Sequence, residues 1–217
     1  MKSLIKLTLL LFILSAYSLA HAQQNINNES FTYKFSPGGS GADIFYLGKG
    51  HSFSLHLSGK LIKEQSPAGK ANNQWLFVVD KNIIQTSLVP LPQPIPAKMH
   101  LGKLTKDETQ EMLNGYVGYE MDYFDKELKL NPHNLYEKWD TVNSKLFLVW
   151  IFEFKAPNTD TLKDITRQAY FSTVCFNQVL DINMPLTRND DLGKTLDLLE
   201  KLAFTLKTYD RRLEIKE

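Results

Sequence analysis

The feature that most constrains the fold is an unbroken apolar run, Leu-Phe-Leu-Val-Trp-Ile-Phe, at positions 146–152. Its length and its β-branched and aromatic side chains are typical of a strand. A strand that is apolar on both faces has to be covered on both faces, so it belongs inside a sheet. One cover is supplied by an amphipathic helix predicted over 190–207, with Thr187 or Asn189 as its cap. Its apolar face carries Leu192, Leu196, Leu199, Ala203 and Leu206.

Alternating apolar and polar residues predict further strands before and after this run. The predicted strands cover 31–35, 52–62, 74–79 and 83–89, and the last two are joined at 80–82 in the manner of a hairpin. Alternation from 168 to 184 is interrupted near Asn177, which leaves one long strand or a hairpin as alternatives. We expect Pro185 to end this segment.

A second helix is predicted from Thr105, where Thr105 and Glu108 form a capping box, to the Asn131-Pro132 step. Gly115 and Gly118 lie inside this helix, and we expect them to allow close approach of a neighbouring strand. The apolar stripe of the helix comprises Leu113, Val117, Met121, Phe124 and Leu128.

The order of strands, helix, strands and helix indicates an α+β fold. We expect a mostly antiparallel β-sheet, with the amphipathic C-terminal helix and the second, central helix packed on it. The predicted organisation is a flexible leader at 23–30, a single α+β domain at 31–210 and a charged, fraying tail at 211–217.

The first 22 residues are typical of a cleaved signal peptide. Lys2 and Lys6 precede an apolar core, and Ala20-His21-Ala22 offers small residues where a signal peptidase cuts, which predicts Gln23 as the mature N-terminus. The apolar core is shorter than the roughly 20 residues of a membrane span. We therefore expect an exported protein, periplasmic or extracellular, with no integral membrane span after cleavage.

Charge and cysteine content exclude several classes of function. Removal of Lys2 and Lys6 leaves 23 basic residues against 24 acidic ones, so the sequence offers no electrostatic case for binding nucleic acid. Cys175 is the single cysteine and lies in a strand pattern, which indicates a buried side chain rather than a nucleophile. The glycine-rich loop at 36–41 lacks the spacing of a phosphate-binding loop.

Acidic residues and histidines do not assemble into a recognisable catalytic or metal-binding motif. The acidic residues of the central helix are interleaved with lysines and have no histidine at ligand spacing, so we interpret them as a solvated helix face. We predict no metal site, no catalytic residue and no cofactor. The acidic residues concerned are Glu120, Asp122, Asp125 and Glu127.

The best candidate for a binding site is a cluster of aromatic side chains with polar groups between 115 and 140. Such side chains suit the rims of pockets and interfaces, although they also suit the edge of an ordinary core. A protein or a small molecule is the expected partner. The candidate residues are Tyr116, Tyr119, Tyr123, Tyr136 and Trp139.

The segment 146–207, which runs from the apolar strand to the terminal helix ending in Leu-Ala-Phe-Thr-Leu-Lys at 202–207, is similar to the C-terminal half of PsbP-like proteins. The resemblance implies a small α+β domain in which helices pack on an antiparallel sheet. It assigns no functional residue. The region 31–98 departs from the pattern because it carries more strand and a proline run.

Three hypotheses of function remain. The first is an exported, non-catalytic binding or accessory domain of the bacterial envelope, since the sequence assembles no activated nucleophile, metal set or acid–base pair. The second is a secreted, hydrolase-like enzyme with a dispersed site built from His56, His100, His133 and the acidic helix. The third is an envelope-assembly or structural component, with Pro90, Pro92, Pro94 and Pro96 as its docking element.

Overall fold

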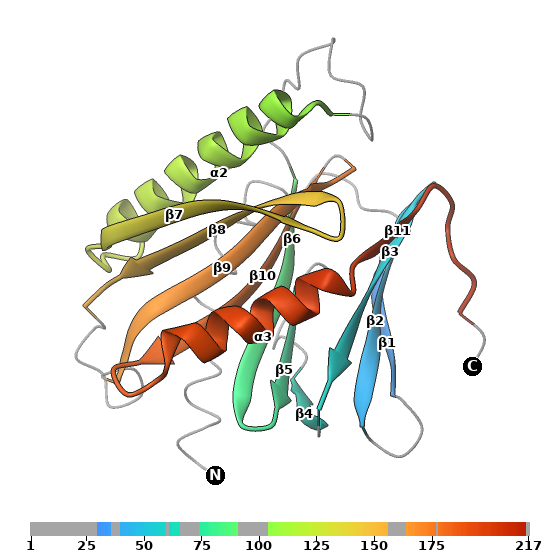
Figure 1. The fold of residues 1–217 in the computed structure, drawn as a ribbon, viewed down its shortest axis with the longest axis horizontal. Coiled ribbons are helices and arrows are strands. Elements are labelled where there is room, and N and C mark those ends of the chain that lie inside the picture. The colour runs from blue at the N-terminus through green and yellow to red at the C-terminus, as the bar shows by residue number, and fades with distance from the viewer. Residues whose placement is uncertain are drawn as a thin grey trace.

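The computed structural model describes residues 30–35, 40–59, 61–65, 74–90, 104–155, 164–176 and 178–215. Within these residues the chain forms two antiparallel sheets and two α-helices (Figure 1), which confirms the expected α+β fold. The helices are α2 (Lys106–Lys126) and α3 (Leu192–Phe204). The predicted signal peptide, the leader up to Glu29 and the proline run from 91 onwards lie outside the described residues.

The smaller sheet has the strand order β1-β2-β3-β11, and the larger one has the order β4-β5-β6-β10-β9-β8-β7. The strands of the smaller sheet are β1 (Ser30–Phe35), β2 (Gly41–Leu47), β3 (Ser52–Ser58) and β11 (Lys207–Tyr209). Those of the larger sheet are β4 (Leu61–Gln65), β5 (Gln74–Val79), β6 (Asn82–Pro90), β7 (His133–Val142), β8 (Lys145–Glu153), β9 (Ile165–Cys175) and β10 (Gln178–Thr187).

The apolar run at 146–152 lies in β8, between β9 and β7, and is buried from Phe147 to Phe152. Successive side chains of a strand point to opposite faces, so this run supplies two cores at once. Phe147, Val149 and Ile151 belong to a core on one side of the sheet. Leu148, Trp150 and Phe152 belong to a separate core on the other side.

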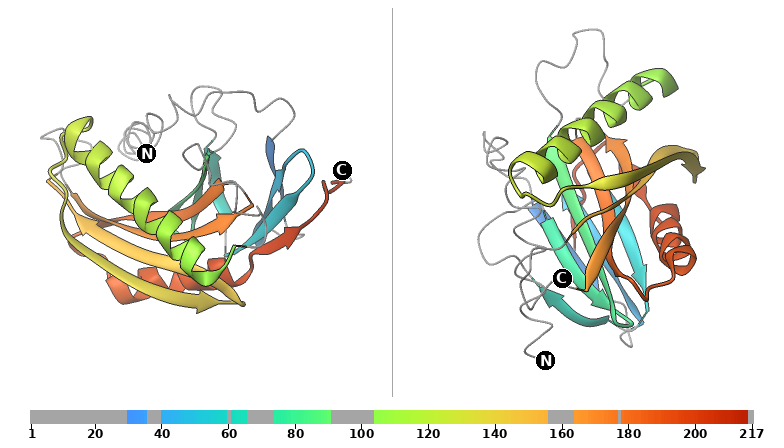
Figure 2. Two further views of the ribbon diagram at one scale, coloured as in Figure 1. Left: turned by 90° about the horizontal axis from the view of Figure 1, so that it is seen from above. Right: turned by 90° about the vertical axis from the view of Figure 1, so that its left-hand side faces the viewer.

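The two helices cover opposite faces of the seven-stranded sheet (Figure 2). On one face, α3 and the smaller sheet together enclose the larger core, in which Leu199, Phe53 and Phe147 are fully buried. On the other face, α2 packs over β8 and β9 and encloses an aromatic core around Trp150 and Phe152. The sheet is therefore the middle layer of the molecule.

Two hairpins organise the larger sheet. Asp80 and Lys81 both have positive φ angles and join β5 to β6 in the predicted two-strand hairpin. Of the two alternatives for 168–184, the hairpin is confirmed, because β9 pairs with β10 from Cys175 and Gln178 onwards.

The prediction that Pro185 ends its strand is wrong. Pro185 pairs with Gln168 of β9, and β10 runs on to Thr187. The pairing of β10 with β6 reaches only Asn183, so the missing amide hydrogen of Pro185 is not needed by a second neighbour.

The strand predicted over 52–62 is two strands in two different sheets. Gly59 separates β3 from β4 with a φ of +127°, a conformation that favours glycine. A Cβ atom at this position would lie 2.7 Å from a Val79 methyl carbon, so glycine is also required by the close approach of β5. The alternating pattern continues through the break and conceals it.

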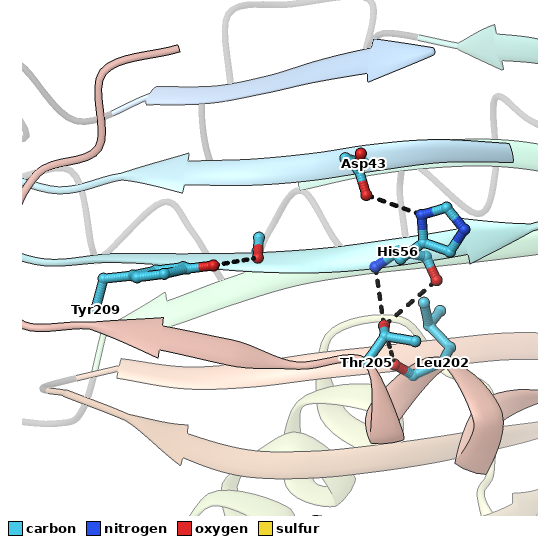
Figure 3. A network of polar contacts seen from close by, with 6 residues as sticks. Asp43, His56, Leu202, Thr205 and Tyr209 are labelled. Carbon is cyan, nitrogen blue, oxygen red and sulfur yellow. Dashed lines mark hydrogen bonds and ion pairs between the residues drawn. The ribbon is translucent and has the colours of Figure 1, made fainter. Parts of the chain in front are cut away.

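The C-terminal end of α3 is tied to the smaller sheet (Figure 3). The His56 amide donates to Thr205 Oγ1 over 2.8 Å, and this hydroxyl lies 2.7 Å from the Leu202 carbonyl oxygen, to which it can donate. The chain then continues as β11, which pairs with β3, and the Tyr209 hydroxyl lies 3.3 Å from Ser54 Oγ.

Two expectations at the ends of α3 are corrected. Asp191 caps the helix by accepting from the Lys194 amide, in place of the predicted Thr187 or Asn189. The charged tail does not fray directly after Asp210, because Arg212 donates to backbone carbonyls of β2 and of the residue that follows it, and the Leu213 amide donates to Ser52 Oγ.

The capping box of α2 is confirmed, since the Glu108 amide donates to Thr105 Oγ1 and the Thr105 amide donates to Glu108 Oε2. The helix ends at Lys126, earlier than the Asn131-Pro132 step. Gly115 and Gly118 do not serve close packing, because both are exposed and a Cβ atom at either position would meet nothing within 4 Å.

Gly115→Ala and Gly118→Ala are each expected to raise the free energy of unfolding by up to about 1 kcal/mol, because alanine has the higher helix propensity and finds open space here. Chemical denaturation of each variant beside the parent protein measures the change. Destabilisation by either variant would contradict the open environment described for these two positions.

Candidate functional site

The five aromatic candidates do not lie on one surface. Tyr116 and Tyr123 face inward from α2 and are 5% and 9% exposed, whereas Tyr119 on the outer side of α2 is 50% exposed. Tyr136 is 53% exposed and pairs with Ile151, which belongs to the α3 side of the sheet. Trp139 pairs with Leu148 and packs against the α2 core. Directly paired residues share a face, so Tyr136 and Trp139 lie on opposite faces of β7.

The structure reveals a different polar cluster, buried between α2 and the seven-stranded sheet. Glu120 of α2 is 4% exposed and Asp181 of β10 is 1% exposed. The interpretation of the acidic residues as a solvated face therefore holds for Asp122, Asp125 and Glu127, which are exposed, and is wrong for Glu120. Glu120 follows Val117 by three residues and precedes Phe124 by four, which places it on the buried side of the helix.

Asp181 is held by a chain of hydrogen bonds that joins four elements, α2, β8, β9 and β10. The Tyr116 hydroxyl donates to its Oδ2, and the Ser172 hydroxyl donates to its Oδ1. Ser172 is directly opposite Asp181 on β9, and its oxygen accepts from Trp150 Nε1 over 2.8 Å. Both oxygens of the Asp181 carboxyl group are thus satisfied inside the core.

Glu120 has no comparable set of donors. Its Oε1 atom is buried and has no hydrogen-bond partner among the described residues. No ion pair of the described residues involves Glu120 or Asp181. Burying a carboxylate without a partner is costly, so such a group takes up a proton instead.

Burial raises the pKa of both carboxyl groups. Burial first, and the negative charge of Asp181 second, raise the pKa of Glu120 to about 8, although a hydrogen bond with Tyr116 offsets part of the shift. Burial raises the pKa of Asp181 to about 6 against the opposing effect of its bonds from Ser172 and Tyr116. Both carboxyl groups therefore retain their protons to a higher pH than exposed carboxyl groups do.

Aromatic rings surround the carboxyl pair. Trp150 stacks on Tyr170 with ring centroids 3.9 Å apart, and the ring of Tyr116 meets Trp150 edge-on. Burial, followed by the nearby Glu120 and Asp181, raises the pKa of Tyr170. The low polarity of this shell is the physical reason why the carboxyl groups hold their protons so strongly.

Of the histidines proposed for a dispersed catalytic site, the two that the structure describes, His56 and His133, are not brought together. His56 lies in the smaller sheet, where its Nδ1 is 2.8 Å from Asp43 Oδ1, and the Thr205 hydroxyl contacts its backbone rather than its ring (Figure 3). His133 begins β7 at the edge of the larger sheet. His100 lies outside the described residues. Among the described residues no group of three or more His, Cys, Asp or Glu could hold a metal ion.

Cys175 is buried, as predicted, and burial raises the pKa of its thiol to about 11. A nucleophilic cysteine needs an easily formed thiolate. Cys175 is therefore a packing residue of the larger core.

Two open clefts lie elsewhere on the surface. One, of about 440 Å³, lies between the first turn of α2 and β11 and includes Lys106, Lys145 and Phe176 in its walls. The other, of about 560 Å³, lies at the N-terminal end of α3 beside Asp190 and Lys194. Glu120 and Asp181 line neither of these clefts.

Comparison with known proteins finds weak similarities of fold and nothing more. No protein-family model matches the sequence, and no curated protein matches it either. Among solved structures, the cyanobacterial PsbP protein (CyanoP) of Synechocystis sp. PCC 6803 matches with a TM-score of 0.46 and 10% identity, covering 86% of this chain and 96% of that one. A protein of Bacteroides thetaiotaomicron VPI-5482 matches with a TM-score of 0.40 and 9% identity over 84% of this chain, and this chain spans about half of its length, 48%.

The resemblance to PsbP-like proteins is thus confirmed as a weak similarity of fold. It extends well beyond the 146–207 segment on which it was based. Similarity at this level carries no information about activity or partner. Among the described residues, none of the helices has the length and apolar character needed to span a membrane.

Proposed function

We propose that this chain is a non-catalytic binding or accessory domain exported to the bacterial envelope. The observation that supports the proposal most is that the carboxyl groups with the largest changes in pKa are buried, away from the accessible surface of the protein. A catalytic acid or base has to reach its substrate, and enzymes place groups with displaced pKa values in accessible clefts. Glu120 and Asp181 instead lie between α2 and the seven-stranded sheet, are at most 4% exposed, and line neither open cleft.

The surface that we propose for binding reaches around the edge strand β7, from Tyr119 on the outer side of α2 to Tyr136 on the opposite face of the sheet. Tyr119, Leu135 and Tyr136 are large side chains that are between 42% and 53% exposed there. Exposed aromatic side chains provide contact area at a small cost in conformational entropy, which suits the recognition of a partner. Tyr116, Tyr123 and Trp139 support this surface from inside, through their contacts with the α2 core.

Site-specific photo-crosslinking in intact cells tests the proposal. A photoreactive phenylalanine analogue placed at Tyr119 or Tyr136 is expected to give the same discrete adduct, because both positions contact one partner. Phe204, which is 62% exposed at the end of α3, is the matched control position and is expected to give none. Adducts at all three positions, or at none, would contradict the proposed surface. Turnover of a hydrolase substrate by purified protein that is lost in His56→Ala would contradict the non-catalytic assignment.

Export is tested by the N-terminus of the mature protein. Mass spectrometry of the envelope or secreted fraction is expected to find a chain that begins at Gln23, because Ala20-His21-Ala22 fits signal peptidase cleavage. Recovery of the chain with Met1 intact from the soluble cytoplasmic fraction would contradict the predicted export.

A further inference from the structure

The buried cluster has fewer hydrogen-bond donors than its two carboxyl groups need when both are ionised. The hydroxyl of Tyr116 has a single hydrogen, which it donates to Asp181. The Ser172 hydroxyl likewise donates its single hydrogen to Asp181, and its oxygen accepts a hydrogen bond from Trp150. Glu120, as a carboxylate, would bring two more acceptors and no donor, and its Oε1 atom is already without a partner among the described residues.

We propose that Glu120 and Asp181 hold one proton between them and that this shared proton fastens α2 to the seven-stranded sheet. A protonated Glu120 can donate to the oxygen of Tyr116. Each hydroxyl then donates one hydrogen bond and accepts another, in the order Glu120 to Tyr116 to Asp181. A second series of hydrogen bonds reaches Asp181 from Trp150 through Ser172.

Among the residues that the structure describes, the groups that face the pair carry no positive charge that could neutralise it. Tyr116 and Tyr123 face it from α2, Tyr170 and Ser172 from β9, and Trp150 from β8, and none of these side chains is positively charged. Ser87 is opposite Asp181 on β6 and is neutral. On β7, Glu137 shares the face of Trp150 but is exposed.

The pKa of about 8 for Glu120 and of about 6 for Asp181 support this arrangement, because each group retains its proton to a higher pH than an exposed carboxyl group does. Loss of the shared proton would leave two carboxylates in an aromatic core, competing for the one hydrogen of Tyr116. Two like charges in such surroundings repel strongly. The consequence is a weaker attachment of α2 at alkaline pH.

The proton shared by Glu120 and Asp181 would make the proposed binding surface sensitive to pH. Tyr119 adjoins Glu120 in the helix, so a loosened α2 displaces part of the proposed binding surface. This consequence rests on the proposed function, whereas the shared proton itself does not.

A pH titration of the free protein tests the shared proton without any ligand. Near-ultraviolet circular dichroism reports on the stacked pair Trp150 and Tyr170, and a transition centred near pH 8 is expected in the parent protein. Glu120→Gln supplies a permanent donor without a charge and is expected to abolish the transition. Glu111→Gln makes the same chemical change at an exposed position of α2 and is expected to retain it.

Amide hydrogen exchange gives an independent readout of the attachment of α2. Between pH 6 and about pH 8, opening of α2 is expected to become roughly tenfold more favourable per pH unit, after correction for the intrinsic exchange rate, while α3 stays constant. Glu120→Gln is expected to remove this dependence. An identical pH profile in parent and Glu120→Gln, or equal loss of protection in both helices, would overturn the proposal. Failure of the crosslinking experiment alone would overturn only the proposed binding surface.

Discussion

Replacing Leu199 by alanine is expected to lower the free energy of unfolding by roughly 2–5 kcal/mol. Leu199 is fully buried in the core that α3 shares with both sheets. The substitution removes the transfer free energy of the deleted carbons and leaves a cavity between layers that cannot both move inward. Loss on this scale is a large share of the roughly 5–15 kcal/mol that stabilises a domain.

Lys201→Ala is the matched control for this substitution. Lys201 is two residues further along α3, about 160° around the helix, and is exposed. Its truncation is expected to change the free energy of unfolding by no more than about 0.5 kcal/mol. Urea denaturation of the two variants gives the comparison. Small and equal changes in the free energy of unfolding of both variants would mean that α3 contributes little to the core. That result would contradict the burial of its inner face.

The stability of the protein is expected to fall as the pH rises. A carboxyl group whose pKa is higher in the folded state than in the unfolded chain binds its proton more tightly when folded, so it stabilises the fold in acid. For Glu120 this stabilisation is lost between its ordinary pKa of 4.5 and the folded value of about 8. At about 1.4 kcal/mol per pKa unit, the loss amounts to roughly 3–5 kcal/mol.

Asp181 contributes in the same direction between its ordinary value of 3.8 and about 6, and the two groups titrate as a coupled pair. Glu120→Gln is expected to be more stable than the parent protein at pH 8 and to show a much flatter dependence on pH. Denaturation midpoints measured from pH 5 to pH 9 provide the test. Parallel curves for the two proteins would show that Glu120 is ionised in the folded state at neutral pH.

Local patterns in the sequence predict the elements whose environment is set by their own residues. The apolar run of β8, the capping box of α2, the β5–β6 hairpin and the leucine face of α3 all follow from spacing and residue type. The α+β class follows from their order along the chain.

Elements that depend on distant partners are missed. β11 is only three residues long and forms because β3 offers it an edge about 150 positions earlier in the chain. The pattern also does not predict β2, whose pairing with β3 and β1 builds the smaller sheet. Such pairings depend on which strands become neighbours, and the spacing of residues within one segment carries no information about that.

The carboxyl pair is missed for a different reason. Asp181 alternates with Leu180 and Ile182, which is typical of a strand with one solvated face, but β10 lies in the middle of the sheet and is buried on both. The helical spacing of Glu120 from Val117 and Phe124 could have placed it inside. An acidic residue is usually exposed, and this expectation outweighed the spacing.

The titration of the Glu120 side chain tests the central claim most directly. The carboxyl carbon of Glu120 can be followed by carbon-13 nuclear magnetic resonance in protein labelled at glutamate, and Glu120→Gln assigns the signal by its disappearance. The shared proton predicts a midpoint near pH 8 for Glu120, well above the ordinary glutamate value of 4.5. A Glu120 midpoint in that same ordinary range would contradict the buried pair and the attachment of α2 that depends on it.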